Sequence, residues 1–268
     1  MSEILRVGSS DDERYDRTRR IDWLDLERLF RSNVMLVGAG ALGNEVAKNL
    51  VLSGFRTVTI VDMDRVVGSN LSRCMFFTEE DAKKRVYKAE AVARGMRHLS
   101  PEAAPDAIVG KVEDLPPDVW KGRDVILGCL DNIQARLHVN SHAYTAGIPF
   151  VDGGMDGFIG KVMVVRPPGG ACLQCGMNRT HAKVAELRFS CTGSGVVFHQ
   201  PRVPAEITTT SVVSAIMVRE AMKIVSGRGD LLLSNVFYYD GKRNVSEEIE
   251  VSVNPDCPVH VVHSNGYK

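Results

Sequence analysis

The sequence has little of what marks a secreted, membrane or nucleic-acid-binding protein. Its 268 residues include only six cysteines, too few for a disulfide scaffold, so metal binding or thiol chemistry is the better interpretation. It has no run of about 18 apolar residues to span a bilayer, and its first residues lack the basic and apolar blocks of a signal peptide. Because 33 basic residues balance 33 acidic ones, no net charge attracts nucleic acid or an acidic membrane. We therefore expect a cytoplasmic protein without a nucleic-acid or membrane partner.

The sequence does contain enough apolar material for one large α/β domain, with 44% hydrophobic and 25% charged residues. From residue 34 onward, segments of strand character alternate with segments of helical character. The predicted strands are 34–38, 57–62, 124–129 and 148–152, and the predicted helices are 41–53, 86–99 and 132–146. After residue 153 the pattern changes to strands joined by turns, around one helix at 208–225. This predicts a Rossmann-like, mostly parallel sheet with helices on both faces, extended by antiparallel strands.

We expect the chain to have two parts. Residues 1–33 would form a polar N-terminal arm and a short helix, and on composition alone the first 20 residues would be solvated. Residues 34–268 would form a single domain, with a nucleotide-binding half at 34–153 and the antiparallel extension at 154–268. Within the extension, residues 176–206 have no clear periodicity. A loop of this length is usually functional or mobile, so we interpret it as a crossover that can cover a bound substrate.

A glycine-rich turn follows the first predicted strand and opens the next helix. Gly38, Gly40 and Gly43 form the G-x-G-x-x-G pattern in the context that gives it meaning. Gly38 permits the tight turn, Gly40 lets the backbone approach a phosphate, and Gly43 allows close helix packing. Asp62, at the end of the next strand, is placed to accept hydrogen bonds from ribose hydroxyls. The motif predicts a bound nucleotide, but alone it does not separate a nicotinamide dinucleotide from ATP.

Polar residues further along the chain favour ATP. Asp64, Asn70 and Arg73 follow the second predicted strand, Lys88 opens the next helix, and Asp131 follows the third predicted strand. Taken singly, Arg73 could be a surface ion pair, Lys88 a solvated helix residue and Asp131 a helix N-cap. Together they supply the cations and the metal-binding acid that nucleotidyl transfer needs, because negative charge develops on the α-phosphate and the leaving pyrophosphate. Hydride transfer does not need them.

Four segments that carry these residues make the sequence resemble one protein family. They are VGAGALGNEVAKNLVLSGF, IVDMDRVVGSNLSR, GCLDN and PFVDGGMDGFIGKV. With them the chain resembles the MoeB/ThiF/HesA family of ubiquitin-like-protein activating enzymes, from about residue 14 to residue 260. The motifs are close to those of the adenylating subunits of the eukaryotic ubiquitin and NEDD8 activators, here in a compact prokaryotic or archaeal form. The resemblance implies that residues 34–268 form a ThiF-like adenylation domain.

By this resemblance the protein is an activating enzyme that uses ATP and Mg²⁺. It would adenylate the C-terminal carboxylate of a ubiquitin-like protein that ends in Gly-Gly. Asp62 would hold the ribose and Asp131 the Mg²⁺, while Asn70, Arg73 and Lys88 would bind the phosphates. The full set of implied nucleotide-binding residues is Gly38, Gly40, Gly43, Asp62, Asp64, Asn70, Arg73, Lys88 and Asp131.

The resemblance also implies a role for the N-terminal arm. Arg17 matches the arginine that family members place in the partner subunit's active site, near the γ-phosphate. This predicts a homodimer, because Arg17 would act on the other subunit. One position departs from the family: many relatives have glutamine after the arginine that matches Arg73, whereas this chain has Cys74, which we interpret as small and partly buried.

Two pairs of metal-ligand residues predict a structural zinc site. Cys172 and Cys175 have the C-x-x-C spacing that lets two thiolates bind one tetrahedral zinc, and Cys257 and His260 supply a C-x-x-H pair. The site would be Cys₃His, with no position open for water. The family resemblance supports it, although relatives commonly have a fourth cysteine at the position of His260. His263 is the competing fourth ligand, and a reduced thiol pair without metal is the alternative.

Cys191 is the candidate nucleophile. It lies in the crossover and is expected to be accessible, so its thiol could take the acyl group from an adenylate. In the resembling activating enzymes, a cysteine in this crossover forms the thioester with the small protein, and a conjugating enzyme is then a further partner. The alternative is an incidental loop cysteine, because the sequence shows no base or cation that would lower its pKa. Cys129, within VILGCL, is expected in the core.

Four other functions stay open as alternatives. The nearest is an adenylyltransferase for a sulfur-carrier protein in molybdopterin or thiazole synthesis, in which Cys191 matters less. A tRNA-modifying dehydratase of the same superfamily would bind RNA, which the neutral net charge disfavours. A catalytically idle scaffold subunit should lack Arg73, Lys88 or Asp131, and this chain has all three. A NAD-dependent Rossmann oxidoreductase explains the glycine loop but not the cations that follow it.

Overall fold

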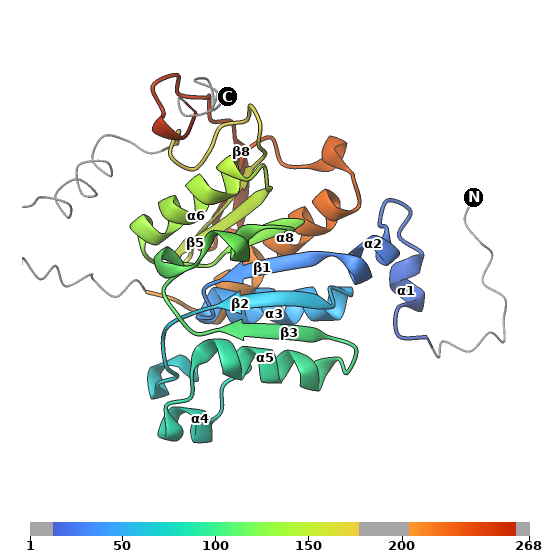
Figure 1. The fold of residues 1–268 in the computed structure, drawn as a ribbon, viewed down its shortest axis with the longest axis vertical. Coiled ribbons are helices and arrows are strands. Elements are labelled where there is room, and N and C mark those ends of the chain that lie inside the picture. Colours follow the sequence, from blue (N-terminus) through green and yellow to red (C-terminus); the bar gives the residue numbers. More distant parts are fainter. Residues whose placement is uncertain (1–12, 177–203, 261–268) are drawn as a thin grey trace, which may run out of the picture.

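The fold is built on a single eight-stranded sheet (Figure 1). It is seen in a computed structural model that describes residues 13–176 and 204–260. The strands lie in the order β3-β2-β1-β4-β5-β6-β7-β8. Their bounds are β1 Asn33–Val37, β2 Thr57–Val61, β3 Ala104–Ile108, β4 Val125–Gly128, β5 Phe150–Asp156, β6 Ile159–Val165, β7 Val236–Asp240 and β8 Val245–Ile249. The described helices are α1 Asp16–Arg19, α2 Leu26–Arg31, α3 Ala41–Ser53, α4 Glu79–Lys84, α5 Lys88–Leu99, α6 Ile133–Thr145 and α8 Ile207–Val225, with short 3₁₀ helices at Gly68–Asn70, Val112–Asp114, Pro117–Trp120 and Gly229–Leu231.

The strands β1 to β5 pair in parallel, as the alternation of strands and helices predicts. β1 lies between β2 and β4, and β3 and β5 flank these two strands. Every residue of β1 and β2 except the first is buried, because a parallel sheet is covered on both faces. β3 and α4 are elements that the sequence analysis does not predict. The β3 strand contains Pro105, which is tolerated because β3 is the edge strand of this sheet.

The sheet changes from parallel to antiparallel pairing at β5. On one side β5 pairs in parallel with β4, and on the other side it forms an antiparallel hairpin with β6. The chain turns between β5 and β6 at Gly157, whose φ of 57° favours glycine. β7 and β8 continue the antiparallel part. The predicted antiparallel extension of a mostly parallel sheet is therefore confirmed.

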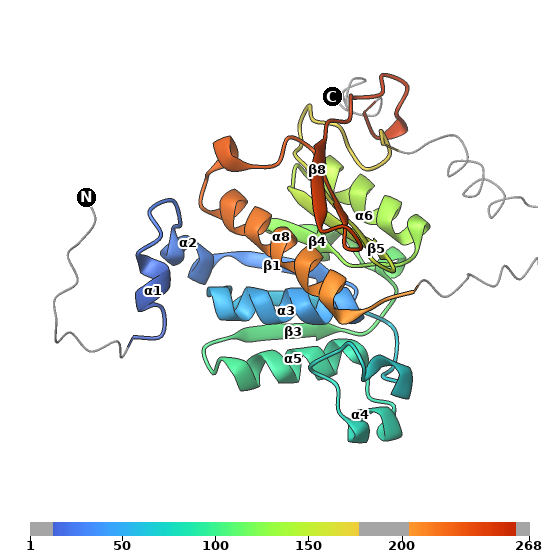
Figure 2. The same ribbon diagram turned by 180° about the vertical axis from the view of Figure 1, so that it is seen from behind.

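Helices cover both faces of the sheet, which confirms the predicted layering (Figures 1 and 2). α3, α5 and α8 lie on one face, where their apolar residues form a buried cluster with Val34 and Leu36 of β1. α6 lies on the opposite face and forms a second buried cluster with Met35 and Val37 of the same strand. Alternate residues of β1 thus anchor opposite layers. Within the described ranges, no helix combines the length and the apolar character needed to cross a bilayer.

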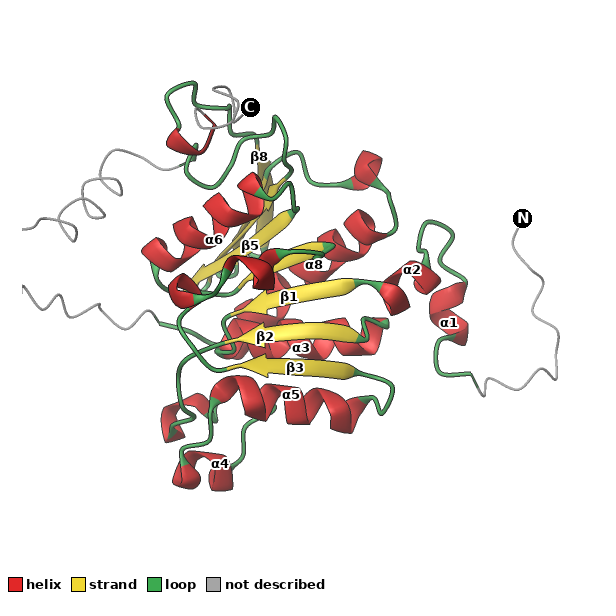
Figure 3. Cartoon of the chain, in the orientation of Figure 1, coloured by secondary structure: helices red, strands yellow, loops and turns green. Residues whose placement is uncertain are grey.

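The described end of the N-terminal arm, residues 13–20, is anchored to the domain by one buried ring, while most of its other residues are exposed. Tyr15 is buried, and its ring centroid lies 5.1 Å from that of Phe30. Arg14 donates from Nη2 to the carbonyl oxygen of Leu99 at 2.7 Å, at the C-terminus of α5, where the helix dipole favours a cation. α1 and α2 lie beside the amino-terminal end of β1 (Figure 3). Composition shows the many charges of this segment but not the burial of its one aromatic ring.

Candidate functional site

The predicted nucleotide-binding residues meet where the strand order reverses. β2 and β3 lie on one side of β1, and β4 and β5 lie on the other. The segments that follow the carboxyl ends of β1 and β4 therefore run in opposite directions. The crevice between two such segments is the usual ligand site of open α/β sheets. The glycine loop follows β1, Asp62 follows β2 and Asp131 lies just beyond β4. All of them stand at this edge of the sheet.

The glycine loop has no room for a side chain at two of its three glycines. A Cβ at Gly38, whose φ is 95°, would lie 2.5 Å from the carbonyl oxygen of Cys129. A Cβ at Gly43 would lie 2.0 Å from the carbonyl oxygen of Gly38. At Gly40 a Cβ would meet nothing within 4 Å, so the space beside this backbone is open. The loop is therefore a cradle that fits a phosphate, at the N-terminus of α3, which no described side chain caps.

The Asp62 carboxylate joins the glycine loop to the segment after β2. Its Oδ2 accepts from Ala39 N–H at 2.7 Å, and its Oδ1 accepts from Asp64 N–H at 2.7 Å. Burial raises the pKa of Asp62, and the two hydrogen bonds and Lys88 oppose that shift. Each carboxylate oxygen keeps a second lone pair, so Asp62 can still accept from ribose hydroxyls.

The residues predicted at the phosphates have hydrogen-bond partners of their own. Lys88 Nζ lies 2.7 Å from Asp64 Oδ2, and only 12% of the lysine side chain is exposed. Arg73 donates from Nη1 to the carbonyl oxygen of Ser69 at 2.6 Å. Asn70 Oδ1 accepts from the backbone N–H of residue 67 at 3.0 Å, which leaves its Nδ2 donors for a ligand. An incoming triphosphate would share or replace the partners of both cations.

Asp131 is the acid predicted to bind Mg²⁺. It is exposed, and it makes no hydrogen bond or ion pair with any residue in the described ranges. The helix after it is capped by Asn132, whose Oδ1 accepts from Gln134 N–H at 2.9 Å. The alternative that Asp131 is the N-cap is therefore wrong. An exposed carboxylate without a partner suits Mg²⁺, which keeps several waters and takes few ligands from a protein.

Asn44 is a residue of this site that the sequence analysis misses. It is buried, and its Nδ2 donates to the carbonyl oxygens of Ala39 and Gly40, both at 3.0 Å. Its Oδ1 accepts from Phe76 N–H at 3.0 Å. Asn44 thus ties the glycine loop to the segment that carries Arg73. The available signal in the sequence is an asparagine inside a largely apolar helix, where asparagine is unfavourable.

Arg17 is distant from this edge in its own chain. α1 lies near the amino-terminal end of β1, whereas the glycine loop follows the carboxyl end (Figure 1). The five residues of β1 alone span about 17 Å. The Arg17 side chain is 70% exposed, with Nε 3.8 Å from Asp16 Oδ2. A role for Arg17 at a phosphate therefore requires a second chain.

Cys74 and Cys129 are two thiols that lie outside the predicted zinc cluster, and their surroundings do not favour a reactive thiolate. Cys74 is buried rather than partly buried, and burial raises its pKa to about 11 while Arg73 opposes the shift. Cys129 packs against the first apolar cluster, as expected, and burial raises its pKa as well. Both thiols are therefore protonated near neutral pH. Cys191, the candidate nucleophile, and His263, the competing zinc ligand, lie outside the described residues.

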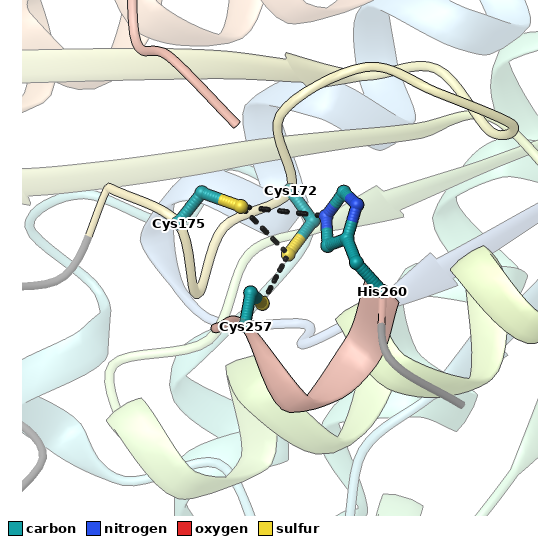
Figure 4. Close-up of side chains that lie close together, drawn as sticks. All are labelled: Cys172, Cys175, Cys257 and His260. Carbon is teal, nitrogen blue, oxygen red and sulfur yellow. Dashed lines mark hydrogen bonds between the residues drawn. The ribbon is translucent and has the colours of Figure 1, made fainter. Parts of the chain in front are cut away.

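The four predicted zinc ligands lie together (Figure 4). Cys172 Sγ is 3.8 Å from Cys175 Sγ and 3.6 Å from Cys257 Sγ, and Cys175 Sγ is 3.3 Å from His260 Nε2. All four ligand atoms lie within 4.8 Å of one another. A tetrahedral zinc with bonds of about 2.3 Å to sulfur places two sulfur atoms about 3.8 Å apart. The cluster has the donor set and the size of a structural zinc site.

His260 presents to the cluster the nitrogen that a metal needs. Its Nδ1 lies 3.2 Å from the hydroxyl oxygen of Tyr144, which also accepts from Gly169 N–H at 3.0 Å. If Nδ1–H donates to Tyr144, the tautomer is fixed and the Nε2 lone pair faces the cysteines. Burial raises the pKa of Cys257 to about 12, with neighbouring Cys172 adding to the shift. A thiolate at this position therefore needs a bound cation to stabilise it.

We predict that Tyr144→Phe weakens zinc binding by about 10- to 100-fold, because it removes the partner that orients His260. The measurement is transfer of zinc from the purified protein to a chromophoric chelator, with the metal content found by mass spectrometry. The matched control is Tyr239→Phe, which removes a tyrosine hydroxyl bonded to Asn244 on the exposed end of the sheet. Equal zinc retention in the two variants, or a native protein that purifies without metal, would contradict the assignment.

Comparisons with known proteins agree with this arrangement. The chain is 32% identical over 239 residues to the sulfur carrier protein adenylyltransferase of Thermus thermophilus, covering 87% of this chain and 83% of that protein. It is 29% identical over 259 residues to the SAMP-activating enzyme E1 of Haloferax volcanii, covering 95% of this chain and 91% of that protein. The NEDD8-activating enzyme E1 catalytic subunit of Schizosaccharomyces pombe is 32% identical over 165 residues, which are 60% of this chain and 37% of that protein.

Solved structures show the same fold. The crystal structure of E. coli MccB with ATP matches with a TM-score of 0.74 at 18% identity, over 95% of this chain and 76% of that one. The family model of the ThiF family matches residues 15–259. This range takes in the glycine cradle, the acid after β2, the acid after β4 and three of the four predicted zinc ligands. The chain belongs to the ThiF family.

Proposed function

We propose that this protein is an ATP-dependent enzyme that adenylates the C-terminal carboxylate of a small ubiquitin-like carrier protein ending in Gly-Gly. The observation that supports it most is the glycine cradle, closed against Cys129, with Asp62 beside it and Asp131 at the same edge of the sheet, an acid that pairs with no residue in the described ranges. Lys88 and Arg73 add two cations that a hydride-transfer enzyme would not need. The Thermus relative is named a sulfur carrier protein adenylyltransferase and the Haloferax relative a SAMP-activating enzyme E1, which supports adenylation of a small carrier protein.

The proposed reaction is a displacement at the α-phosphorus of ATP. A carboxylate oxygen of the carrier attacks the α-phosphorus, the bond to the bridging oxygen breaks, and pyrophosphate leaves with that oxygen. Backbone N–H groups of the glycine cradle, with Arg73 and Lys88, would stabilise the negative charge that develops. Mg²⁺ bound at Asp131 would supply further positive charge to the phosphate oxygens.

We also propose that the enzyme works as a homodimer. Arg17 belongs to α1, which lies at the end of β1 opposite the glycine cradle, and its side chain is 70% exposed, so it would reach the γ-phosphate held by the other chain. A two-fold symmetric dimer supplies one such arginine to each of its two sites. Each chain would then lack one cation of a complete site until it pairs.

The fate of the adenylate separates two candidate functions. In the first, the Cys191 thiolate attacks the carbonyl carbon, a thioester forms, AMP leaves, and a conjugating enzyme accepts the acyl group. In the second, the adenylate of a sulfur-carrier protein passes to a sulfur donor and Cys191 is dispensable. Coverage of the relatives supports both fates, since this chain matches 83% of the Thermus sulfur carrier protein adenylyltransferase and 91% of the Haloferax SAMP-activating enzyme E1.

We predict that ATP–pyrophosphate exchange depends on a carrier protein that ends in Gly-Gly. The panel to test is a ThiS-type sulfur carrier, a SAMP-type protein and NEDD8. Asp131→Ala should lower the exchange at least about 100-fold, because the metal charge is lost from the phosphates. Asp118→Ala, which removes an exposed acid remote from the nucleotide, should leave the exchange unchanged.

Cys191→Ala should keep the exchange. If Cys191 forms a thioester, this variant should also lose the reducible adduct with the carrier. Exchange that survives Asp131→Ala would contradict the metal assignment.

A mixing experiment tests the action of Arg17 on the partner. Arg17→Ala and Asp131→Ala should each be inactive as pure proteins. In an equal mixture that has dissociated and reassembled, half of the dimers are mixed, and each mixed dimer holds one intact site. The mixture should therefore recover about a quarter of native activity. A mixture that stays inactive while mass spectrometry detects mixed dimers would show that Arg17 serves its own chain. An Arg17→Ala protein that is active on its own would show that Arg17 has no catalytic role.

A further inference from the structure

The carboxyl edge of the sheet carries a second charged pair, apart from the residues of the glycine cradle. Arg136, in α6, places Nε 3.1 Å from both carboxylate oxygens of Asp152, in β5, and its Nη2 also donates to Oδ2. The Asp152 side chain is 1% exposed and that of Arg136 is 19% exposed. Burial lowers the pKa of Arg136, but the attraction to Asp152 outweighs it and raises the pKa overall. The hydrogen bonds hold the two side chains in a fixed geometry.

The guanidinium plane is held by a glycine. A Cβ at Gly154 would lie 3.0 Å from Nη2 and 3.1 Å from Nη1 of Arg136, so the fork packs on bare backbone. The Asp152 carboxylate accepts hydrogen bonds from Nε and Nη2 of Arg136. Nη1 makes no hydrogen bond with any residue in the described ranges, and it is not among the buried polar atoms that lack a partner. One arm of the fork therefore presents N–H donors to solvent in a fixed direction.

The Arg136–Asp152 pair is level, in the register of the sheet, with the end of β1, where the glycine cradle begins. Val37 of β1 pairs with Gly128 of β4, and Gly128 pairs with Asp152. Neighbouring strands are about 4.8 Å apart, so Asp152 lies about 10 Å from the end of β1. It lies on the side of β1 opposite to Asp62, which follows β2. If the ribose of ATP lies at Asp62, the nucleotide does not occupy the β5 side of the cradle, and the tail of the carrier protein can bind there.

A second cation strengthens the positive field beside β5. Lys161, on β6, is the cross-strand partner of Gly154. Burial and the charge of Arg136 lower the pKa of Lys161, while Asp152 opposes the shift. Lys161 forms no ion pair with any described acid. Two cations thus share a single carboxylate, and the surplus positive charge favours an anionic group at this edge.

We infer that Arg136 binds the reacting end of the carrier tail, with Nη1 donating to its C-terminal carboxylate or last carbonyl oxygen. This inference rests on the function proposed above. A tail of glycines offers no side chain to recognise, so it must be held through its carbonyls and its carboxylate, the groups that a fixed arginine fork binds well.

Two variants test whether Arg136 binds the carrier tail or only stabilises the fold through its ion pair with Asp152. Arg136→Lys keeps a cation beside Asp152 but removes the fixed second arm. With the carrier of the panel that supports the most pyrophosphate exchange, this variant should raise the KM for the carrier about tenfold or more. The KM for ATP should stay within about twofold, because the nucleotide contacts are unchanged. Arg123→Lys is the matched control, since Arg123 bonds Asn33 and Thr59 toward the other end of the sheet.

A second variant leaves the arginine in place. Gly154→Ala puts a methyl group against Nη1 and Nη2, so the fork must move, and the KM for the carrier should rise as well. Gly229→Ala, where a Cβ meets nothing within 4 Å, is its control. If Arg136→Lys does not fold, Gly154→Ala decides the question. An unchanged carrier KM in the folded variants, or equal changes for carrier and ATP, overturns the inference. Native protein without exchange would instead overturn the proposed function itself.

Discussion

Close packing of backbone against backbone, between the glycine loop and the end of β4, is the constraint on which the site depends. At Gly38 the carbonyl oxygen of Cys129 occupies the place of a Cβ, and at Gly43 the carbonyl oxygen of Gly38 does so. This packing brings the N-terminus of α3 beside the loop that carries Asp131. Asn44 then ties the glycine loop to the segment that carries Arg73, because it donates to Ala39 and Gly40 and accepts from Phe76 N–H. A larger residue at either glycine would separate the strands and disperse the charged groups that the loop gathers.

The charged groups around the cradle are of two physical kinds. Lys88 pairs with Asp64, whose carboxylate is 54% exposed, so water can solvate the acid when a phosphate takes its place beside the lysine. Asp152 is buried and Arg136 largely so, and loss of one partner from a buried pair costs about 3–5 kcal/mol. The first kind can change partners when a ligand binds. The second kind keeps its geometry, which is the property required of a group that orients a substrate.

The sequence predicts the parts of this protein that follow from local patterns. Alternation of strands and helices predicts the parallel sheet, and the spacing of Cys172, Cys175, Cys257 and His260 predicts a cluster that the fold does assemble. It does not predict β3, because Pro105 is acceptable there only at the edge of a sheet, a position that no local pattern reveals. It also misses the pair of Arg136 and Asp152, whose members meet only because α6 packs across β5. Burial and pairing over long sequence separations are properties of the fold.

The central claim is that the cradle beside Cys129 holds a nucleotide triphosphate. Calorimetric titration of the purified protein with Mg·ATP, and separately with NAD⁺, tests it most directly. The account predicts that Mg·ATP binds with one site per chain, that binding weakens when Gly40, beside which the space is open, is replaced by valine, and that NAD⁺ gives no heat of binding. Saturable binding of NAD⁺ with no binding of Mg·ATP would contradict it.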